Sequence, residues 1–122
     1  MKSLLCIIYD FKGPLRWMAC ESLTKQTYSV KSDVWSFAVL LYELFSNGKV
    51  PYEHLSPVEV AIRVVKDGER LEQPAKAPPE LYALMQRAWL VDCDARPTVK
   101  EFETVLRQLA KQKADDSDAS DD

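Results

Sequence analysis

One apolar stretch constrains the fold of this chain more than any other part of its sequence. Residues 32–47, SDVWSFAVLLYELFSN, carry one stripe at helical spacing, made of Val34, Phe37, Leu41 and Leu44. Most of the remaining circumference of such a helix is also apolar, through Ala38, Val39, Leu40, Tyr42 and Phe45. A helix that is apolar nearly all round belongs in a protein interior, and this stretch is shorter than the roughly 20 residues that span a bilayer. We therefore expect a buried central helix around which the other elements pack.

Start and stop signals predict the bounds of the central helix and of the helices that follow it. Ser32 is the predicted N-cap, and Asn47-Gly48 is the predicted end, because glycine adopts the left-handed conformation cheaply. Further amphipathic helices are predicted at residues 57–66, at residues 79–90 and after Thr98. The body of the chain has no convincing strand. The predicted fold class is therefore mainly α, with four helices arranged around the central one and no sheet of note.

Charge and cysteine content exclude several classes of function. The net charge is −3, but five acids lie in the last nine residues, so the rest of the chain carries +2. That balance favours neither nucleic acid nor an anionic membrane as a partner. Three cysteines without CxxC spacing and a single histidine, His54, predict neither a disulfide framework nor a metal site. A reducing, cytoplasmic environment is therefore expected, and no membrane segment is predicted.

The sequence divides into three parts. Residues 1–13 form a poorly defined leader, in which Leu4 to Tyr9 could make a short strand. Residues 14–112 are the predicted folded body. Residues 113–122 are predicted to be a disordered acidic tail, because this segment is rich in aspartate and almost devoid of large apolar side chains.

Several motifs follow one another in the body with regular spacing. They are PLRWMACESL at residues 14–23, KSDVWSFAVLLYEL at 31–44, GKVPY at 48–52 and LYALMQRAWLVDCDARPT at 81–98. In order and spacing they resemble the C-terminal lobe of a protein tyrosine kinase, from Pro14 to about Leu109. Arg16-Trp17-Met18-Ala19 favours the tyrosine-kinase branch. The resemblance implies a partial kinase-like C-lobe, the distal half of a catalytic domain, built around the central helix.

The resemblance implies a structural ion pair between two residues that lie far apart in the sequence. Ala19-Cys20-Glu21 stands where kinases carry Ala-Pro-Glu, and Glu21 would pair with Arg96. Arginine offers a planar fork that is suited to a carboxylate. If the pair is buried, loss of one partner would cost roughly 3–5 kcal/mol, whereas a solvated pair contributes about 0–1 kcal/mol. The sequence leaves both alternatives open.

The resemblance also implies roles for residues near the central helix. Asp33 matches the aspartate that accepts hydrogen bonds from backbone amides of the catalytic loop, although the helix dipole would equally favour an acid in this first turn. Arg16, Trp17, Met18 and Ala19 match the loop that receives the substrate residue after the target tyrosine. Trp17 and Met18 could equally be core side chains. No catalytic residue and no metal ligand is assigned to this chain.

The motifs that handle ATP in the kinase family are missing from these 122 residues. Phosphoryl transfer needs a Gly-rich loop, a strand lysine, a His-Arg-Asp loop and an Asp-Phe-Gly metal ligand. The chain has three glycines, none of them in GxGxxG spacing, and its one histidine lies in Glu53-His54-Leu55. We therefore expect no nucleotide and no cofactor in this chain, although the complete family uses ATP and Mg²⁺.

Three hypotheses about function follow from these residues. The favoured one is a truncated, tyrosine-kinase-like domain that cannot by itself bind ATP or transfer phosphate, and that binds a protein through residues 57–67 or the 14–18 loop. The second is an incomplete gene model of an active protein tyrosine kinase. The third is an independent helical adaptor. Because few elements are available to cover the central helix, we expect a marginal domain that needs a protein partner or aggregates.

Overall fold

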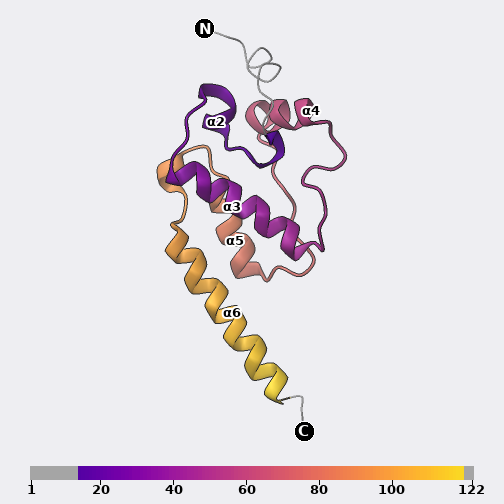
Figure 1. The fold of residues 1–122 in the computed structure, drawn as a ribbon, viewed down its shortest axis with the longest axis vertical. Helices are drawn as coiled ribbons and strands as arrows, with labels where there is room; N and C mark the ends of the chain where they lie inside the picture. The colour runs from indigo at the N-terminus through magenta and orange to yellow at the C-terminus, as the bar shows by residue number, and fades with distance from the viewer. Residues whose placement is uncertain (1–13, 120–122) are drawn as a thin grey trace.

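The computed structural model describes residues 14–119, with side chains described up to residue 115, and every regular element in that range is helical (Figure 1). In chain order the elements are η1 (Leu15–Trp17), α2 (Cys20–Lys25), α3 (Val30–Phe45), α4 (Pro57–Ile62), η2 (Arg63–Asp67), α5 (Pro79–Ala88), η3 (Cys93–Ala95) and α6 (Val99–Ala119). The mainly α fold class predicted from the sequence is confirmed. The predicted leader and its candidate strand lie outside the described residues. Within the described range, no helix is both long enough and apolar enough to cross a membrane.

The central helix α3 begins earlier than predicted, at Val30. Its N-cap is Ser29, whose hydroxyl oxygen accepts hydrogen bonds from the backbone N–H groups of Lys31 at 3.1 Å and Ser32 at 3.4 Å. Ser32 is the third residue of the helix, and its hydroxyl oxygen accepts the backbone N–H of Ser29 at 2.7 Å. The prediction of Ser32 as the N-cap was therefore wrong, because two serines three residues apart form a reciprocal capping box.

The other end of α3 follows the predicted stop signal. The helix ends at Phe45, and Asn47 and Gly48 both have positive φ angles, of 61° and 85°. The backbone N–H of Gly48 donates to the carbonyl oxygen of Glu43 at 2.8 Å. This hydrogen bond, with a left-handed residue before it, is typical of the Schellman ending of a helix. It turns the chain into the loop that precedes α4.

The main core lies where α3, α5 and α6 meet (Figure 1). All three helices contribute side chains that are almost completely buried there: Val34, Trp35, Ala38, Val39, Leu81, Met85, Ala88 and Phe102. The rings of Phe37 and Phe102 meet edge to face with their centroids 5.4 Å apart, which joins α3 to α6. A smaller cluster of Leu15, Met18, Leu23 and Ala61 joins η1 and α2 to α4.

One side of α3 is exposed in the described part of the chain, which corrects the prediction of a helix buried nearly all round. Val30, Leu40 and Leu44 have 69 %, 47 % and 65 % of their surface exposed. Leu44 belongs to the stripe that was predicted to face the core. The apolar pattern on α3 is therefore wider than the surface that α5, α6 and the neighbouring loops cover within residues 14–115.

The helix predicted from residue 57 consists of α4 and the π-helical turn η2. Ser56 and Glu59 form a capping box at its start, and Gly68, with a φ of 68°, ends it. Its inward side chains are Val60, Ala61 and Val64. The outward side chains of α4 and η2 are mainly charged: Glu59, Arg63, Lys66 and Asp67.

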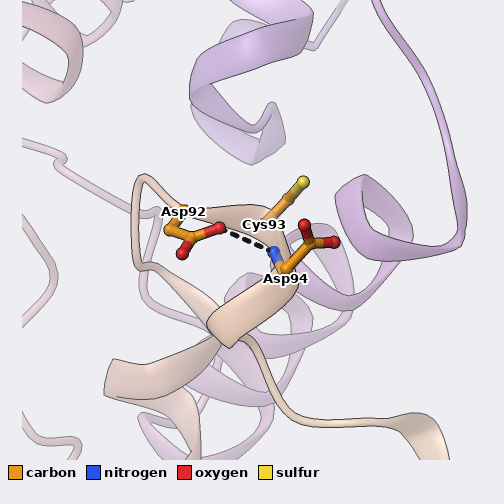
Figure 2. A group of neighbouring side chains, drawn as sticks. All are labelled: Asp92, Cys93 and Asp94. Atoms are coloured by element: carbon orange, nitrogen blue, oxygen red, sulfur yellow. Dashed lines mark hydrogen bonds between the residues drawn. The ribbon is translucent and has the colours of Figure 1, made fainter.

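A tight turn joins α5 to α6. Asp92 caps η3 by accepting the backbone N–H of Asp94 at 3.0 Å (Figure 2). Thr98 then caps α6 as predicted: its hydroxyl oxygen accepts the backbone N–H of Glu101 at 3.2 Å, and the Glu101 carboxylate accepts the backbone N–H of Thr98 at 2.7 Å. Arg96 lies between these two caps, which fix the backbone from which its side chain extends.

α6 is longer than predicted, since it continues to Ala119, past residue 113 where the sequence places the start of a disordered tail. Residues 110–114 are alanine, lysine and glutamine, which are good helix formers, and they carry the helix into the acidic segment. Figure 1 shows this end of α6 extending beyond the other helices. The first part of the acidic segment is therefore helical.

Candidate functional site

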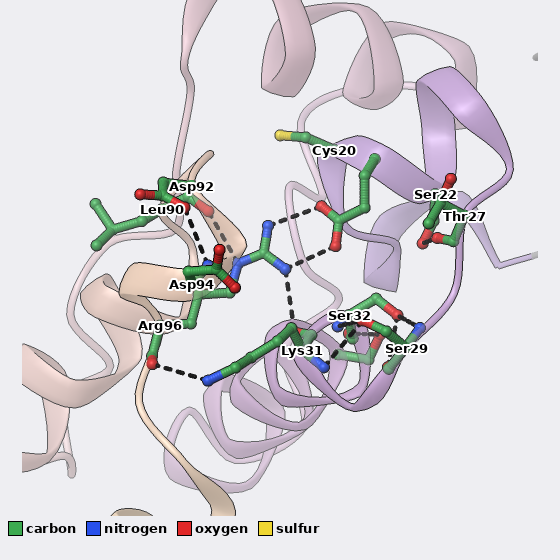
Figure 3. Close-up of polar contacts among 12 residues, drawn as sticks. Cys20, Ser22, Thr27, Ser29, Lys31, Ser32, Leu90, Asp92, Asp94 and Arg96 are labelled. Carbon is green, nitrogen blue, oxygen red and sulfur yellow. Dashed lines mark hydrogen bonds and ion pairs between the residues drawn. The ribbon is translucent and has the colours of Figure 1, made fainter.

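The candidate site centres on Arg96, whose guanidinium reaches Glu21 in the first turn of α2 (Figure 3). Arg96 Nη1 donates to Glu21 Oε2 and Nη2 donates to Oε1, both at 2.8 Å. The Arg96 side chain is 0 % exposed and the Glu21 side chain 19 % exposed. Of the two arrangements that the sequence left open, the structure has the buried, bidentate one.

The same guanidinium binds two backbone carbonyls. Arg96 Nε donates to the carbonyl oxygen of Leu90 at 2.9 Å, and Nη1 donates to that of Lys31 at 3.0 Å. In return, Lys31 Nζ donates to the carbonyl oxygen of Arg96 at 3.5 Å (Figure 3). Arg96 therefore joins α2, the first turn of α3 and the segment after α5, three parts that are distant in the sequence.

Opposing effects set the pKa of Glu21. Burial raises the pKa, whereas the hydrogen bonds from Arg96, a backbone hydrogen bond and the charge of Arg96 lower it. The lowering effects prevail, so the pKa of Glu21 lies below its ordinary value of 4.5. The carboxylate is therefore ionised at neutral pH, where it balances the buried guanidinium.

A second arginine, Arg70, shares an aromatic neighbour with Arg96. Arg70 Cζ lies 4.8 Å and Arg96 Cζ lies 5.1 Å from the centroid of the Trp35 ring, which is 1 % exposed. Both contacts are cation–π interactions. Arg70 Nε also donates to the carbonyl oxygen of Trp89 at 2.8 Å, and Nη1 donates to that of Val64 at 3.0 Å. Trp35 thus links the middle of α3 to two cations that come from separate loops.

Sequence reasoning missed both Arg70 and Trp35 as members of this site. Arg70 lies in the connector GERLEQPAKAPP, which reads as an extended loop, and Trp35 reads as one more core side chain. The contact between the Arg70 guanidinium and the Trp35 ring depends on the fold, and no rule of sequence spacing predicts that residues 35 and 70 meet. The available signal is an arginine between two glutamates in a connector that also carries Lys76, which is too weak to assign a partner.

Cys20 lies beside the same cluster, with its Sγ 3.8 Å from Arg70 Nη2. The sequence shows no basic group near Cys20, whereas the fold brings Arg70 and Arg96 close to it. Burial raises the pKa of the thiol and the two arginines lower it, with burial the larger effect, so the pKa is raised overall. A thiol that is 8 % exposed and has a raised pKa is protonated at neutral pH and is a poor nucleophile.

The segment containing Arg16 is tied to the loop that follows α3. The guanidinium of Arg16 donates to three backbone carbonyls of this loop, at 2.8 to 3.0 Å: those of Pro51, Tyr52 and Leu55. These hydrogen bonds bring residues 14–18 against the loop at 51–55, which the sequence did not indicate.

Trp17 is fixed to α3 by two hydrogen bonds. Its Nε1 donates to Glu43 Oε1 at 2.6 Å, and its carbonyl oxygen accepts the hydroxyl of Ser36 at 2.7 Å. Met18 and Ala19 follow with 8 % and 1 % exposure. Met18 and Ala19 are thus core side chains, while Arg16 and Trp17 are half-buried and carry the polar contacts of this segment.

Asp33 is exposed in the first turn of α3. The position suits an acid, since the positive end of the helix dipole lies there. In the described part of the chain, Asp33 is not among the groups that the Arg96 guanidinium binds. The sequence contains no His-Arg-Asp loop whose amides could donate to it.

Among residues 14–115, one group of side chains has the spacing of possible metal ligands, namely Asp92, Cys93 and Asp94 (Figure 2). Their ligand atoms lie within 4.8 Å of one another. Both aspartates are exposed, and Asp92 already serves as the cap of η3. Exposed acids in a turn are common without a bound ion, so no metal role is assigned and the absence of a metal site stays a prediction.

The class of protein is shown by comparison with known families. Arg96 ties the central helix to the Ala-Cys-Glu segment, which is the pairing that the resemblance to a kinase C-lobe predicts. A sequence model of the family described as protein tyrosine and serine/threonine kinase matches residues 9–106. The chain belongs to this kinase family.

Several curated kinases are similar to the chain. Tyrosine-protein kinase RYK of Homo sapiens is 42 % identical over 104 residues, covering 85 % of the chain and 17 % of the relative. Tyrosine-protein kinase csk-1 of Caenorhabditis elegans is 40 % identical over 98 residues, covering 80 % and 17 %. Macrophage colony-stimulating factor 1 receptor of Danio rerio is 33 % identical over 117 residues, covering 93 % and 12 %. The chain therefore spans between 12 % and 17 % of the length of these relatives.

Proposed function

We propose that this 122-residue chain is a kinase-like protein-interaction module that does not by itself bind ATP or transfer phosphate. One observation carries the proposal. The buried Glu21–Arg96 pair ties together the part of a C-lobe that resembles the substrate side, in a chain whose sequence holds none of the nucleotide-binding motifs. The chain would thus keep part of the helical framework of a kinase while lacking the motifs that bind ATP in the family.

The proposal that the chain does not transfer phosphate rests on the groups that this reaction requires. Its transition state is stabilised by positioned cations, by backbone amides around the phosphates and by an aspartate that accepts the substrate proton. In the chain, the guanidiniums of Arg70 and Arg96 are already engaged with backbone carbonyls, with Trp35 or with Glu21. Asp33 is exposed, but the sequence holds neither the Gly-rich loop nor the strand-lysine motif that a nucleotide site requires.

The proposed partner is a protein, and the proposed binding surface comprises α4, η2 and the segment at residues 14–18. The buried side of α4 is used for packing, so a partner would meet its charged outer side, with Glu59, Arg63 and Lys66. Mixed charges of this kind favour a protein over nucleic acid, which needs a basic patch. We propose an intracellular location for the module, in agreement with the sequence-based expectation of a reducing compartment.

Calorimetric titration of the full chain with ATP in the presence of Mg²⁺ tests the proposal. A complete tyrosine kinase domain measured alongside provides the positive control. We expect no heat of binding from the chain at nucleotide concentrations that saturate the control. Saturable, Mg²⁺-dependent binding of ATP would contradict the proposal.

A second candidate is that the 122 residues are one piece of an active protein tyrosine kinase whose nucleotide-binding part is encoded elsewhere in the gene. The coverage of 12 % to 17 % of the relatives' lengths favours this candidate. The coding sequence upstream of Met1 separates the two. An in-frame Gly-rich loop followed by a His-Arg-Asp motif would assign the phosphotransferase activity to the longer protein.

A further inference from the structure

A small pocket opens between α2, η2 and the turn that follows α5. Its volume is about 260 Å³, and the residues that line it come from three separate parts of the chain: Cys20, Glu21, Thr24, Lys25, Val65 and Val91. We call it the α2–η2 pocket. None of its lining residues belongs to the segment at residues 14–18 or to α3.

Arg96 fixes two of the three walls of the pocket. Its guanidinium binds the Glu21 carboxylate on α2 through two hydrogen bonds of 2.8 Å, and its Nε donates to the carbonyl oxygen of Leu90, the residue before Val91, at 2.9 Å (Figure 3). Asp92, the residue after Val91, caps η3. The backbone on both sides of Val91 is therefore held by hydrogen bonds.

Arg70 fixes the third wall of the pocket. Its Nη1 donates to the carbonyl oxygen of Val64, the residue before Val65, at 3.0 Å, and its Nη2 lies 3.8 Å from Cys20 Sγ. The two arginines therefore hold all three walls in place before any partner binds. A preformed site of this kind avoids much of the entropic cost of ordering its own side chains on binding.

Val91 has the largest exposed fraction among the large apolar side chains of residues 14–115, at 71 %. Single exposed aliphatic side chains are common on proteins, but Val91 borders a pocket in which a second wall carries another valine, Val65. Because its backbone is fixed, Val91 cannot fold back to bury itself. A partner that covers it removes apolar surface from water, which is favourable.

The size and charge of the pocket indicate what it would bind. Its volume of about 260 Å³ lies below the roughly 300–1,000 Å³ of pockets that take drug-sized ligands, so it suits a single side chain. Two charged residues line it. Glu21 is balanced by Arg96, whereas Lys25 is exposed and forms no ion pair within residues 14–115. The pocket therefore favours an apolar group with a negative charge beside it.

We propose that the α2–η2 pocket binds one aliphatic side chain of a protein partner, next to an aspartate or glutamate of the partner that pairs with Lys25. The aliphatic side chain contacts Val65 and Val91, and the carboxylate lies at the Lys25 ammonium. The inference rests on the proposed function, because it takes the partner to be a protein. It adds a pocket beside η2 and the chemistry of the segment that the pocket recognises.

Photo-crosslinking of the full chain with a short peptide tests the proposal. The probe is acetyl-Gly-Asp-Leu-Asp-Gly-amide, in which the leucine is replaced by an analogue that carries a diazirine. The comparison peptide has lysine in place of both aspartates. Mass spectrometry identifies the crosslinked residues and measures their yield.

We expect the aspartate peptide to label the lining residues of the pocket about fivefold more than the lysine peptide does, at equal concentrations below saturation. The reason is that Lys25 attracts the first peptide and repels the second. Equal labelling of the pocket by the two peptides would overturn the proposal, as would the absence of labelling there.

Two pairs of variants at exposed positions locate the contact. Val91→Ser should lower the labelling by the aspartate peptide about fivefold, whereas Val30→Ser, at a valine of 69 % exposure on α3, should leave it unchanged. Lys25→Glu should reverse the preference between the two peptides, whereas Lys111→Glu, in the part of α6 that extends beyond the other helices, should retain it (Figure 1). Unchanged labelling in Val91→Ser or an unchanged preference in Lys25→Glu would contradict the proposal.

Sedimentation velocity distinguishes a second copy of the chain from a different protein. If the chain associates with itself and Val91→Ser abolishes that association, the pocket belongs to a second copy and the proposal is overturned. The binding of ATP is measured separately. Saturable ATP binding with pocket labelling intact would overturn the proposed function alone, whereas no ATP binding and no pocket labelling would overturn this inference alone.

Discussion

Arg96 joins three segments of the described fold that are distant in the sequence. Its guanidinium is fully buried, and it binds the Glu21 carboxylate and the backbone carbonyls of Lys31 and Leu90. It also lies over the Trp35 ring. A buried charge is tolerated when it is paired and hydrogen-bonded in this way, and it becomes costly as soon as one partner is removed.

Glu21→Ala is therefore expected to destabilise the chain strongly, because it leaves the Arg96 guanidinium buried without its counter-charge. The expected loss is roughly 3–5 kcal/mol in the free energy of unfolding, measured by urea denaturation. The matched control is Glu103→Ala, which removes the exposed Arg107–Glu103 pair, with side chains 79 % and 53 % exposed. That change should cost no more than about 1 kcal/mol. Similar costs for the two variants would show that the buried pair contributes little.

The Glu21–Arg96 pair predicts that the stability of the folded chain depends on pH. The pKa of Glu21 is lowered in the folded state, so its contribution to stability is fully present above the ordinary value of 4.5 and is lost as the pH falls through the folded-state pKa. We expect the urea midpoint of the chain to fall in acid below pH 4.5, and Arg96→Met, which removes the interaction, to show a shallower fall. Parallel curves for the two proteins would contradict this expectation.

At the scale of elements, the start of α3 shows how a helix boundary is decided. Ser29 has an extended backbone, with a φ of −159°, and its hydroxyl satisfies two backbone N–H groups of the first turn. Ser32 completes the box from within the helix. Because Arg96 binds the carbonyl oxygen of Lys31, this cap also sets the position of one group in the candidate site.

Ser29→Ala should cost about 1 kcal/mol of unfolding free energy, because the N–H groups of Lys31 and Ser32 lose their acceptor. Ser29→Asp should retain most of the stability, since its carboxylate can accept the same bonds near the positive end of the helix. Ser46→Ala at the other end of α3 is the control. Its hydroxyl makes one bond of 3.3 Å to Glu43, and we expect a smaller effect. Thermal denaturation of the three variants measures the differences.

At the scale of the whole molecule, the described helices do not bury all of their apolar surface. α3 and α6 share an open face, and the carboxyl end of α6 extends beyond the other helices (Figure 1). Leu40, Leu44 and Val99 are 47 %, 65 % and 53 % exposed, so apolar surface of both helices is in contact with solvent in the described part of the chain.

We therefore expect the full chain to unfold in a broad transition below the range of about 45–65 °C that is common for domains of this size, or to associate as its concentration rises. Differential scanning calorimetry together with sedimentation velocity measures both properties. A sharp transition in a monomer that stays soluble would contradict this expectation. It would favour the third hypothesis, an independent helical adaptor.

Much of this architecture is determined by the sequence. The helices after residue 56 begin near their predicted positions, and the first of them ends at the predicted glycine, because the capping residues Ser56 and Thr98 and the ending at Gly68 act on backbone groups only a few residues away. The Glu21–Arg96 pair was within reach of sequence reasoning for a different reason. The motifs around the two residues resemble those of the kinase family, and the pair was predicted from this resemblance. The spacing of residues along the sequence would not predict a contact between positions 21 and 96.

Only the tertiary structure decided which side chains are buried by packing against other elements. Periodicity shows that α3 is apolar nearly all round, but whether Leu40 or Leu41 is buried depends on elements that lie elsewhere in the chain; Leu41 is 3 % exposed and Leu40 47 %. The contact of Trp35 with Arg70 and Arg96 has the same origin, since each partner reaches the ring from a separate loop. Local signals set the helices, and the long-range arrangement of those helices sets burial and charge pairing, because both depend on distance in space.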